Sequence, residues 1–148
     1  MLCDGVRILA MKDTEHPPQT VVEKEPSPYG YELVLDLHGC NSAKFNRADI
    51  DGYFTELCQR ISMKKCEVHF WDDVGVPIEE RQTSPQTKGT SAVCFILTST
   101  VVVHTLDILE AVYVNIFSCK TFDSAVAAEF TEDWFQAGSC KSTFVPRG

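Results

Sequence analysis

Three apolar runs rich in valine, isoleucine and threonine follow one another closely between residues 91 and 119. They cover about residues 91–98, 100–106 and 111–119, with only short breaks between them. Runs of β-branched and aromatic residues bounded by turn residues are typical of β-strands. Because breaks this short join antiparallel neighbours rather than parallel ones, the segment predicts three strands of an antiparallel sheet.

Further elements precede and follow this segment. Residues 31–37 place Tyr31 and three leucines on one face, which predicts a first strand. Asn46 is a suitable N-cap for a helix from about 47 to 62, in which apolar residues recur at helical spacing. The remaining elements are a short aromatic strand, a second helix and a closing strand, at about 67–71, 123–136 and 140–145.

The element order β-α-β-β-β-β-α-β, with most strands joined as hairpins, predicts an α+β fold. We expect a two-layer sandwich in which a mainly antiparallel sheet carries both helices on one face. The run at 91–98 is apolar on both faces, so the second face of the sheet also needs a cover. The residues expected to face the helix–sheet core are Ile50, Phe54, Leu57 and Ile61 in the first helix, Val126, Phe130 and Trp134 in the second, and Trp71 near the short strand.

The composition restricts the partners of the chain. A net charge of −8 argues against nucleic acid, because binding to phosphates depends on clustered lysine and arginine. The seven cysteines form no CxxC pair, which favours free thiols in a reducing cytoplasm. We expect no membrane span or signal peptide, since no apolar run is long enough and no basic region precedes one. The histidine and cysteine spacings fit no zinc site, so no metal is expected.

A chain of 148 residues corresponds to one domain. Residues 1–28 combine four prolines with many charged side chains, a composition with too little apolar surface to order itself. We therefore expect a flexible leader over 1–28 and a single domain over 29–148.

Four residues of the strand-rich segment have side chains suited to covalent chemistry: Ser91, Ser99, His104 and Cys119. A serine hydroxyl is a weak nucleophile that needs a base or a distorted electrophile beside it. In a flat strand Ser99 and His104 would point to opposite faces, because an odd offset reverses the side chain. A bend or bulge at residues 98–100 would be needed to bring these two side chains together.

The spacing of these four residues in strand context resembles the self-cleavage region of the prokaryotic-type S-adenosylmethionine decarboxylases, and the resemblance covers about residues 29–146. It implies that the chain cuts itself between Thr98 and Ser99 and converts Ser99 into a covalent pyruvoyl cofactor. His104 is then the base in processing, Ser91 assists it, and Cys119 is the acid that protonates the product. The resemblance also implies a homodimer in which the partner chain completes each active site.

The substrate-binding residues differ from the family pattern. After the positions of His104 and Thr105 the family continues with Trp-Pro-Glu, whose glutamate holds the ribose hydroxyls, whereas this chain has Ile108 at the glutamate position. Pro85 lies near the position of the aromatic residue that stacks on adenine. The carboxylates that could replace the glutamate are Asp36, Asp107 and Glu110.

The resemblance makes S-adenosylmethionine the first choice of substrate, with the product supplying aminopropyl groups for polyamines such as spermidine. Two alternatives stay open. One is a pyruvoyl-dependent decarboxylase of another amino acid, ornithine or arginine, whose cationic side chain could meet Glu79 and Glu80. The other is an unprocessed homologue that binds a small ligand or a partner chain without catalysis.

Overall fold

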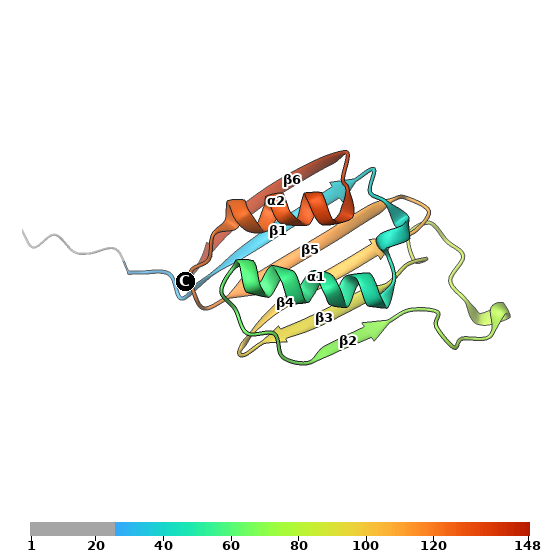
Figure 1. The fold of residues 1–148 in the computed structure, drawn as a ribbon, viewed down its shortest axis with the longest axis horizontal. Coiled ribbons are helices and arrows are strands. Elements are labelled where there is room, and N and C mark those ends of the chain that lie inside the picture. The colour runs from blue at the N-terminus through green and yellow to red at the C-terminus, as the bar shows by residue number, and fades with distance from the viewer. Residues whose placement is uncertain (1–25) are drawn as a thin grey trace, which may run out of the picture.

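The strands pair into one six-stranded antiparallel sheet with the order β2-β3-β4-β5-β1-β6 in a computed structural model that describes residues 26–148 (Figure 1). Every predicted helix and strand is present. Short 3-10 turns lie at Ser42–Lys44 and Ile78–Glu80. The main elements are β1 (Gly30–His38), α1 (Arg47–Arg60), β2 (Val68–Trp71), β3 (Ser91–Ile96), β4 (Ser99–Leu106), β5 (Ala111–Ser118), α2 (Ser124–Phe135) and β6 (Ser139–Arg147).

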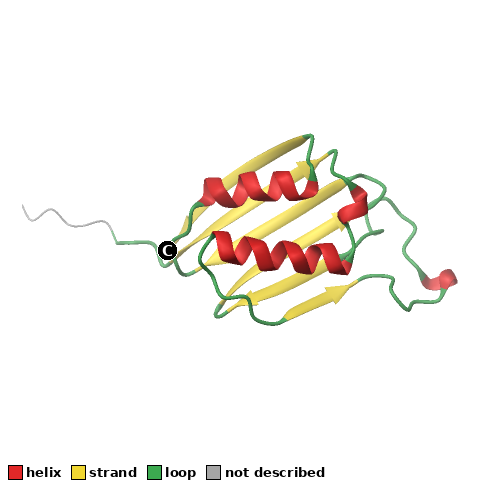
Figure 2. Cartoon of the chain, in the orientation of Figure 1, coloured by secondary structure: helices red, strands yellow, loops and turns green. Residues whose placement is uncertain are grey.

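Both helices lie side by side across one face of the sheet, which confirms the predicted two-layer α+β sandwich (Figure 2). The core lies between the layers. It is built from alternate residues of the central strands, such as Leu33 and Leu35 of β1 and Val101 and Val103 of β4, all fully buried. The opposite face of the sheet carries no element of the described chain (Figure 1).

Helix α1 forms as predicted. Asn46 caps it by accepting a hydrogen bond from the amide of Asp49 at 2.9 Å, which satisfies one free donor of the first turn. The predicted stripe from Ile50 to Ile61 is buried, together with Tyr53 and Cys58. The Tyr53 hydroxyl lies 2.9 Å from Thr131 Oγ1 of α2, so this buried polar group has a partner.

The predicted inward face of α2 is wrong by part of a turn. Phe130 is buried as expected, but Val126 is 36% exposed and Trp134 only half-buried. The buried positions are Ala127, Phe130, Thr131 and Phe135. A small residue at 127 lets α2 approach the sheet closely, and the bulkier valine then lies at the edge of the contact.

The segment around Ser99 is a tight hairpin. The expected boundaries, strands at 91–98 and 100–106, are wrong because β3 ends at Ile96 and β4 begins at Ser99 itself. Leu97 and Thr98 form a two-residue turn between the paired residues Ile96 and Ser99. Such turns need a positive φ, and Leu97 supplies it at φ 61°, a conformation that costs energy for a residue with a side chain.

The expected leader at 1–28 falls mainly outside the described residues. Residues 26–28 lie in neither helix nor strand before β1 begins at Gly30, close to the predicted start of the domain. Within residues 26–148, neither helix has the length and apolar character that crossing a membrane requires.

Candidate active site

Ser99 lies at the turn of the β3–β4 hairpin, next to the end of β5. Its side chain is on the helix-covered side of the sheet and only 3% exposed. Ser99 Oγ donates a hydrogen bond to Cys119 Sγ at 3.7 Å and accepts one from the Cys119 amide at 3.2 Å. Thr98 Oγ1 lies 3.7 Å from the same sulfur. The turn therefore brings the predicted pyruvoyl precursor and the predicted acid into direct contact.

The contact changes the acidity of Cys119. Hydrogen bonds from the hydroxyls of Thr98 and Ser99 stabilise the thiolate and lower the pKa of Cys119 below its ordinary value. Cys119 follows the last residue of β5 and is exposed, not buried as a cysteine on an apolar strand normally is. A cysteine with these properties can accept and return a proton.

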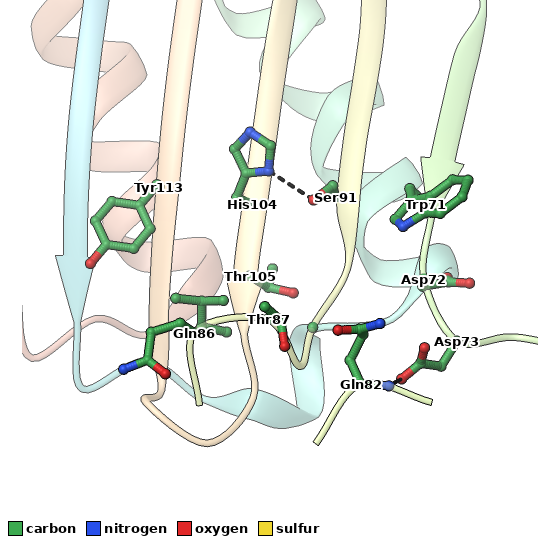
Figure 3. Close-up of a pocket in the computed structure, with 12 residues that line it drawn as sticks. Trp71, Asp72, Asp73, Gln82, Gln86, Thr87, Ser91, His104, Thr105 and Tyr113 are labelled. Atoms are coloured by element: carbon green, nitrogen blue, oxygen red, sulfur yellow. Dashed lines mark hydrogen bonds between the residues drawn. The ribbon is translucent and has the colours of Figure 1, made fainter. Parts of the chain in front are cut away.

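His104 and Ser91 form a second pair, at the other end of β4. They face each other across the β3–β4 ladder, with Ser91 Oγ 2.8 Å from His104 Nδ1 (Figure 3). His104 lies on the face of the sheet that the helices do not cover. The hydrogen bond fixes the orientation of the imidazole ring and leaves its other nitrogen available.

The two pairs do not meet within one chain. Between Thr100 and Leu106 strand β4 pairs with β5 in unbroken register, so the bend at residues 98–100 that would bring Ser99 and His104 together is absent. Ser99 is buried beneath the helices, whereas His104 is exposed on the opposite face. Five residues of extended strand also separate them by roughly 16 Å. One chain therefore does not bring Ser99 and His104 together.

His104 belongs to a row of side chains that crosses the open face. The strand registers place Trp71 opposite Ser91, Ser91 opposite His104, and His104 opposite Tyr113. Trp71 is 81% exposed, so its expected place in the core is wrong. With residues of the loop before β3 this row lines a cavity of about 500 Å³ (Figure 3). The rings of Trp71 and Tyr113 thus form two walls of the cavity, and the Ser91–His104 pair lies between them.

The sequence did not single out Trp71 or Tyr113 as site residues. The available signal was the end of an aromatic strand, Phe70 and Trp71, followed by two acids. Only the pairing of β2 with β3 shows that Trp71 adjoins Ser91. Asp72 and Asp73, which follow Trp71 directly, also line the cavity.

The three predicted substrate carboxylates lie apart from one another. Asp36 continues the cross-strand row, opposite Tyr113, on the open face. Asp107 instead lines a neighbouring cavity of about 490 Å³, where one of its carboxylate oxygens is buried without a partner and burial raises its pKa. Glu110 is exposed in the β4–β5 turn. None of the three lines the cavity that contains His104, and Pro85 does not line it either.

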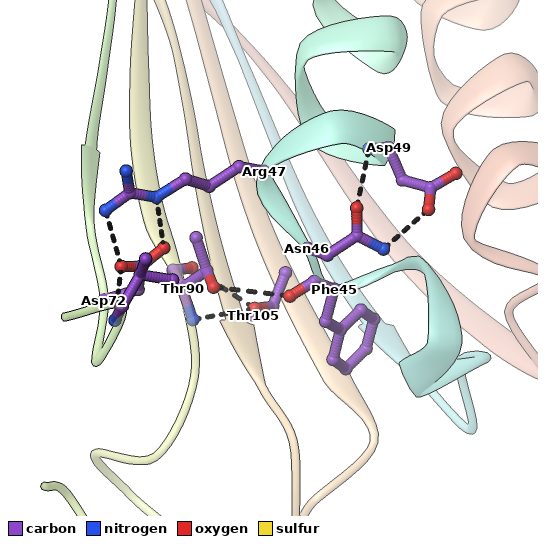
Figure 4. Close-up of polar contacts among 8 residues, drawn as sticks. Phe45, Asn46, Arg47, Asp49, Asp72, Thr90 and Thr105 are labelled. Atoms are coloured by element: carbon purple, nitrogen blue, oxygen red, sulfur yellow. Dashed lines mark hydrogen bonds and ion pairs between the residues drawn. The ribbon is translucent and has the colours of Figure 1, made fainter.

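Close backbone packing fixes the loop that forms this cavity. A Cβ atom on Gly89 would lie 1.7 Å from the Thr105 carbonyl oxygen, so only glycine allows the loop to approach β4 here. Thr90 and Thr105 exchange backbone and hydroxyl hydrogen bonds, and Thr90 also bonds the carbonyl of Phe45 (Figure 4).

An ion pair anchors the other wall of the cavity. Arg47, the first residue of α1, donates two hydrogen bonds of 2.7 Å to the carboxylate of Asp72 (Figure 4). This contact lowers the pKa of Asp72. Among residues 26–148, no three histidine, cysteine or acidic side chains are grouped so that they could hold a metal ion.

The fold and the β3–β4 hairpin together define a two-layer α+β protein with a serine directly after a tight turn. A family model described as S-adenosylmethionine decarboxylase matches residues 31–148. Among solved structures, the adenosylmethionine decarboxylase from Aquifex aeolicus VF5 has the same fold, with a TM-score of 0.64 at 16% sequence identity. The match covers 83% of this chain and 93% of that one. No curated protein matches the chain.

The chain belongs to the S-adenosylmethionine decarboxylase family. The family resemblance inferred from the sequence is thereby confirmed. Membership makes the chain a carboxy-lyase of the adenosylmethionine decarboxylase type, which acts on S-adenosylmethionine in polyamine biosynthesis.

Proposed function

We propose that the chain cuts itself between Thr98 and Ser99 and that the pyruvoyl group formed from Ser99 is its cofactor. The observation that carries this proposal is the placement of Ser99 directly after a strained two-residue turn, with its hydroxyl against Cys119. A serine within a regular strand would have neither a strained turn directly before it nor a thiol beside its oxygen.

Cleavage can start from the observed contacts. Ser99 Oγ attacks the carbonyl carbon of Thr98, and the bond from that carbon to the Ser99 nitrogen breaks. The hydroxyl proton passes to Cys119 Sγ, 3.7 Å away, and from there to the freed amino group. The product is an ester that joins the two parts of the chain through the serine side chain.

A base then removes the Ser99 Hα. The ester C–O bond breaks, Thr98 leaves as a carboxylate, and the dehydroalanine that remains takes up water, loses ammonia and becomes the pyruvoyl group. The residues present fit such a group, because Cys119 adjoins the position where it forms. The group supplies the electron sink for loss of CO2, and Cys119 returns a proton to the product.

The required base is His104 of a second copy of the chain. Ser99 and His104 lie at opposite ends of β4 and do not meet within one chain, which supports a site shared between two chains. A two-fold axis that crosses β4 near Val102 would place the Ser99 end of one protomer over the His104 end of its partner. The apolar side chains of Val93, Phe95 and Phe117 on the open face would be buried in that homodimer.

The cavity between Trp71 and Tyr113 is the proposed seat of the substrate nucleoside. An exposed indole stacks on a planar base and attracts a cation such as a sulfonium. Asp73 on the same wall offers a carboxylate to hydroxyl groups, whereas both oxygens of Asp72 are engaged by Arg47. Glu79 and Glu80, which could have met an ornithine or arginine side chain, line neither this cavity nor its neighbour.

The cellular compartment of the protein is proposed from the state of its cysteine thiols. The six cysteines of the described residues are all free, which supports a reducing environment such as the cytoplasm.

The mass of the purified protein tests the proposal. We expect fragments 1–98 and 99–148, the second without a free amino group, from the wild-type chain. A single intact chain is expected from Ser99→Ala. His104→Ala should stop after the acyl shift and leave an ester that hydroxylamine cleaves. Cleavage of Ser99→Ala at the same bond would contradict the assigned serine chemistry.

A further inference from the structure

The segment that joins α1 to β2 runs beside the Ser99 hairpin. The Cys66 amide donates a 2.8 Å hydrogen bond to the Phe95 carbonyl, and the Phe95 amide donates one of 2.9 Å to Glu67. These bonds continue the pairing of β2 with β3 as far as the last residues before the turn. The segment between α1 and β2, here called the linker, thus supports the outer edge of the β3–β4 hairpin.

Cys66 contacts the turn itself. The Leu97 amide donates a hydrogen bond to Cys66 Sγ at 3.5 Å, and the thiol donates its own hydrogen to the Lys64 carbonyl at 3.6 Å. The thiol therefore bridges the linker and the turn, and both its acceptor and its donor are used.

Leu97 is the residue that needs such a contact. Its φ of 61° is unfavourable for leucine, and its side chain is 70% exposed, so little side-chain packing holds it in place. Among the described residues, the side chain that holds Leu97 by a hydrogen bond is Cys66, which accepts from the Leu97 amide.

The conformation of Leu97 decides how the next residue presents its carbonyl. Thr98 follows directly, and its carbonyl carbon is the atom that Ser99 Oγ must reach. Thr98 and Ser99 are held from the other side by Cys119. The turn thus lies between two thiols, one on the amide of Leu97 and one on the hydroxyls of Thr98 and Ser99.

We propose that Cys66 is a positioning residue for self-cleavage, which holds Leu97 in the left-handed conformation that presents the Thr98 carbonyl to Ser99. This inference rests on the proposed function, since it concerns the rate of the step proposed there. Cys66 touches neither reacting atom, and it acts before the cofactor exists. Its loss should therefore slow cofactor formation and leave turnover by chains already cut unchanged.

The test is a pulse-chase of the full chain made in a cell-free system, with the appearance of fragments 1–98 and 99–148 followed over time. Cys66→Ala should slow cleavage about fivefold, which corresponds to the loss of one ordinary hydrogen bond. Cys66→Ser should keep most of the rate, because a hydroxyl also accepts from the Leu97 amide. Cys140→Ala, at a half-buried cysteine of β6 far from the hairpin, is the matched control and should cleave like the wild type.

Repeating Cys66→Ala in a chain that also carries Leu97→Gly separates the positioning of Leu97 from general support of the hairpin. Glycine adopts positive φ without strain, so Leu97→Gly should make the turn independent of the thiol. Cys66→Ala should then cost little in the Leu97→Gly chain, whereas a merely structural contact would cost the same factor in both backgrounds.

The outcomes distinguish this inference from the proposed function. Equal cleavage rates for the wild type and Cys66→Ala overturn the role of Cys66 alone, as does an equal cost in both backgrounds. A wild-type chain that never splits overturns the proposed function and this inference together.

Discussion

Cys119 has neighbours that cleavage itself removes. In the uncut chain its thiolate is stabilised by the hydroxyls of Thr98 and Ser99, which lower its pKa. The proposed cleavage would remove the Ser99 hydroxyl and leave Thr98 as the free end of the other fragment. The same thiol then returns toward its ordinary pKa and holds a proton. Acceptance of a proton during processing and donation during turnover are thus compatible in one residue.

The acidity of Cys119 in the uncut chain can be measured. In Ser99→Ala, which stays intact, the Thr98 hydroxyl still stabilises the thiolate, so alkylation of Cys119 should have a pH midpoint below that of an ordinary cysteine. Adding Thr98→Val removes the larger of the two causes and should raise the midpoint. Mass spectrometry of the Cys119 peptide gives both profiles. Identical midpoints in the two proteins would show that the Thr98 hydroxyl does not lower the pKa of Cys119.

Turnover should depend on Cys119 more than cleavage does. Cys119→Ala should lose about two to four orders of magnitude in decarboxylation rate, the usual contribution of a general acid. Water can replace the thiol as proton carrier in cleavage, so some fragment should still form. CO2 release per pyruvoyl group measures the loss, with Cys140→Ala as the control. Wild-type turnover in a folded Cys119→Ala protein would show that another group protonates the product.

At the scale of elements, the sequence predicts what depends on local pattern. Alternation over 31–37 and the helical stripe from Ile50 to Ile61 depend on neighbouring residues, and both elements form as expected. The row of Trp71, Ser91, His104 and Tyr113 depends instead on the register of three strand pairs, which no local pattern specifies. Local pattern therefore predicts the strand and the helix, whereas it does not predict the aromatic walls of the cavity.

The hairpin boundary shows the same division. β-branched residues continue through Thr98 and Thr100, so the run looks like strand on both sides of Ser99. The turn forms at Leu97 and Thr98 although neither is a usual turn residue. Tertiary contacts support the turn at this position. The Leu97 amide bonds Cys66 Sγ, and the Thr98 hydroxyl contacts Cys119 Sγ. A strained turn of this kind is typical of a functional site.

The ion pair between α1 and the end of β2 should give the fold an acid-sensitive contact. The Arg47 guanidinium lowers the pKa of Asp72, so its stabilisation is complete above the pKa of an unfolded aspartate, about 3.9, and is lost as the pH falls through the lower folded value. Asp72→Asn should therefore lower Tm at pH 7, and the difference from the wild type should vanish in strong acid. Thermal melts across this range test it. Asp133→Asn, at an exposed carboxylate that forms no ion pair with the described residues, is the control and should leave Tm close to that of the wild type.

At the scale of the whole molecule, the open face of the sheet carries both the apolar patch and the second half of the site. Val93 and Phe95 lie on this face, as does His104 at one end of it. In the proposed dimer, a second copy turned by two-fold symmetry would cover this apolar patch and bring His104 toward the partner hairpin in one step. Formation of the dimer and completion of the site are then the same event, so cleavage should depend on protein concentration.

Mixed dimers test this arrangement most directly. Ser99→Ala and His104→Ala chains should each remain uncleaved alone, because every site then lacks one required residue. When the two are produced together, a shared site combines Ser99 from the His104→Ala chain with His104 from the Ser99→Ala chain, and that site is intact. Only the His104→Ala chain of each mixed pair should then be cut, as the masses of the fragments show. If each site lay within one chain, every site would keep a defect and no mixture would be cleaved. Cleavage of His104→Ala on its own would instead contradict the role of His104 as the base.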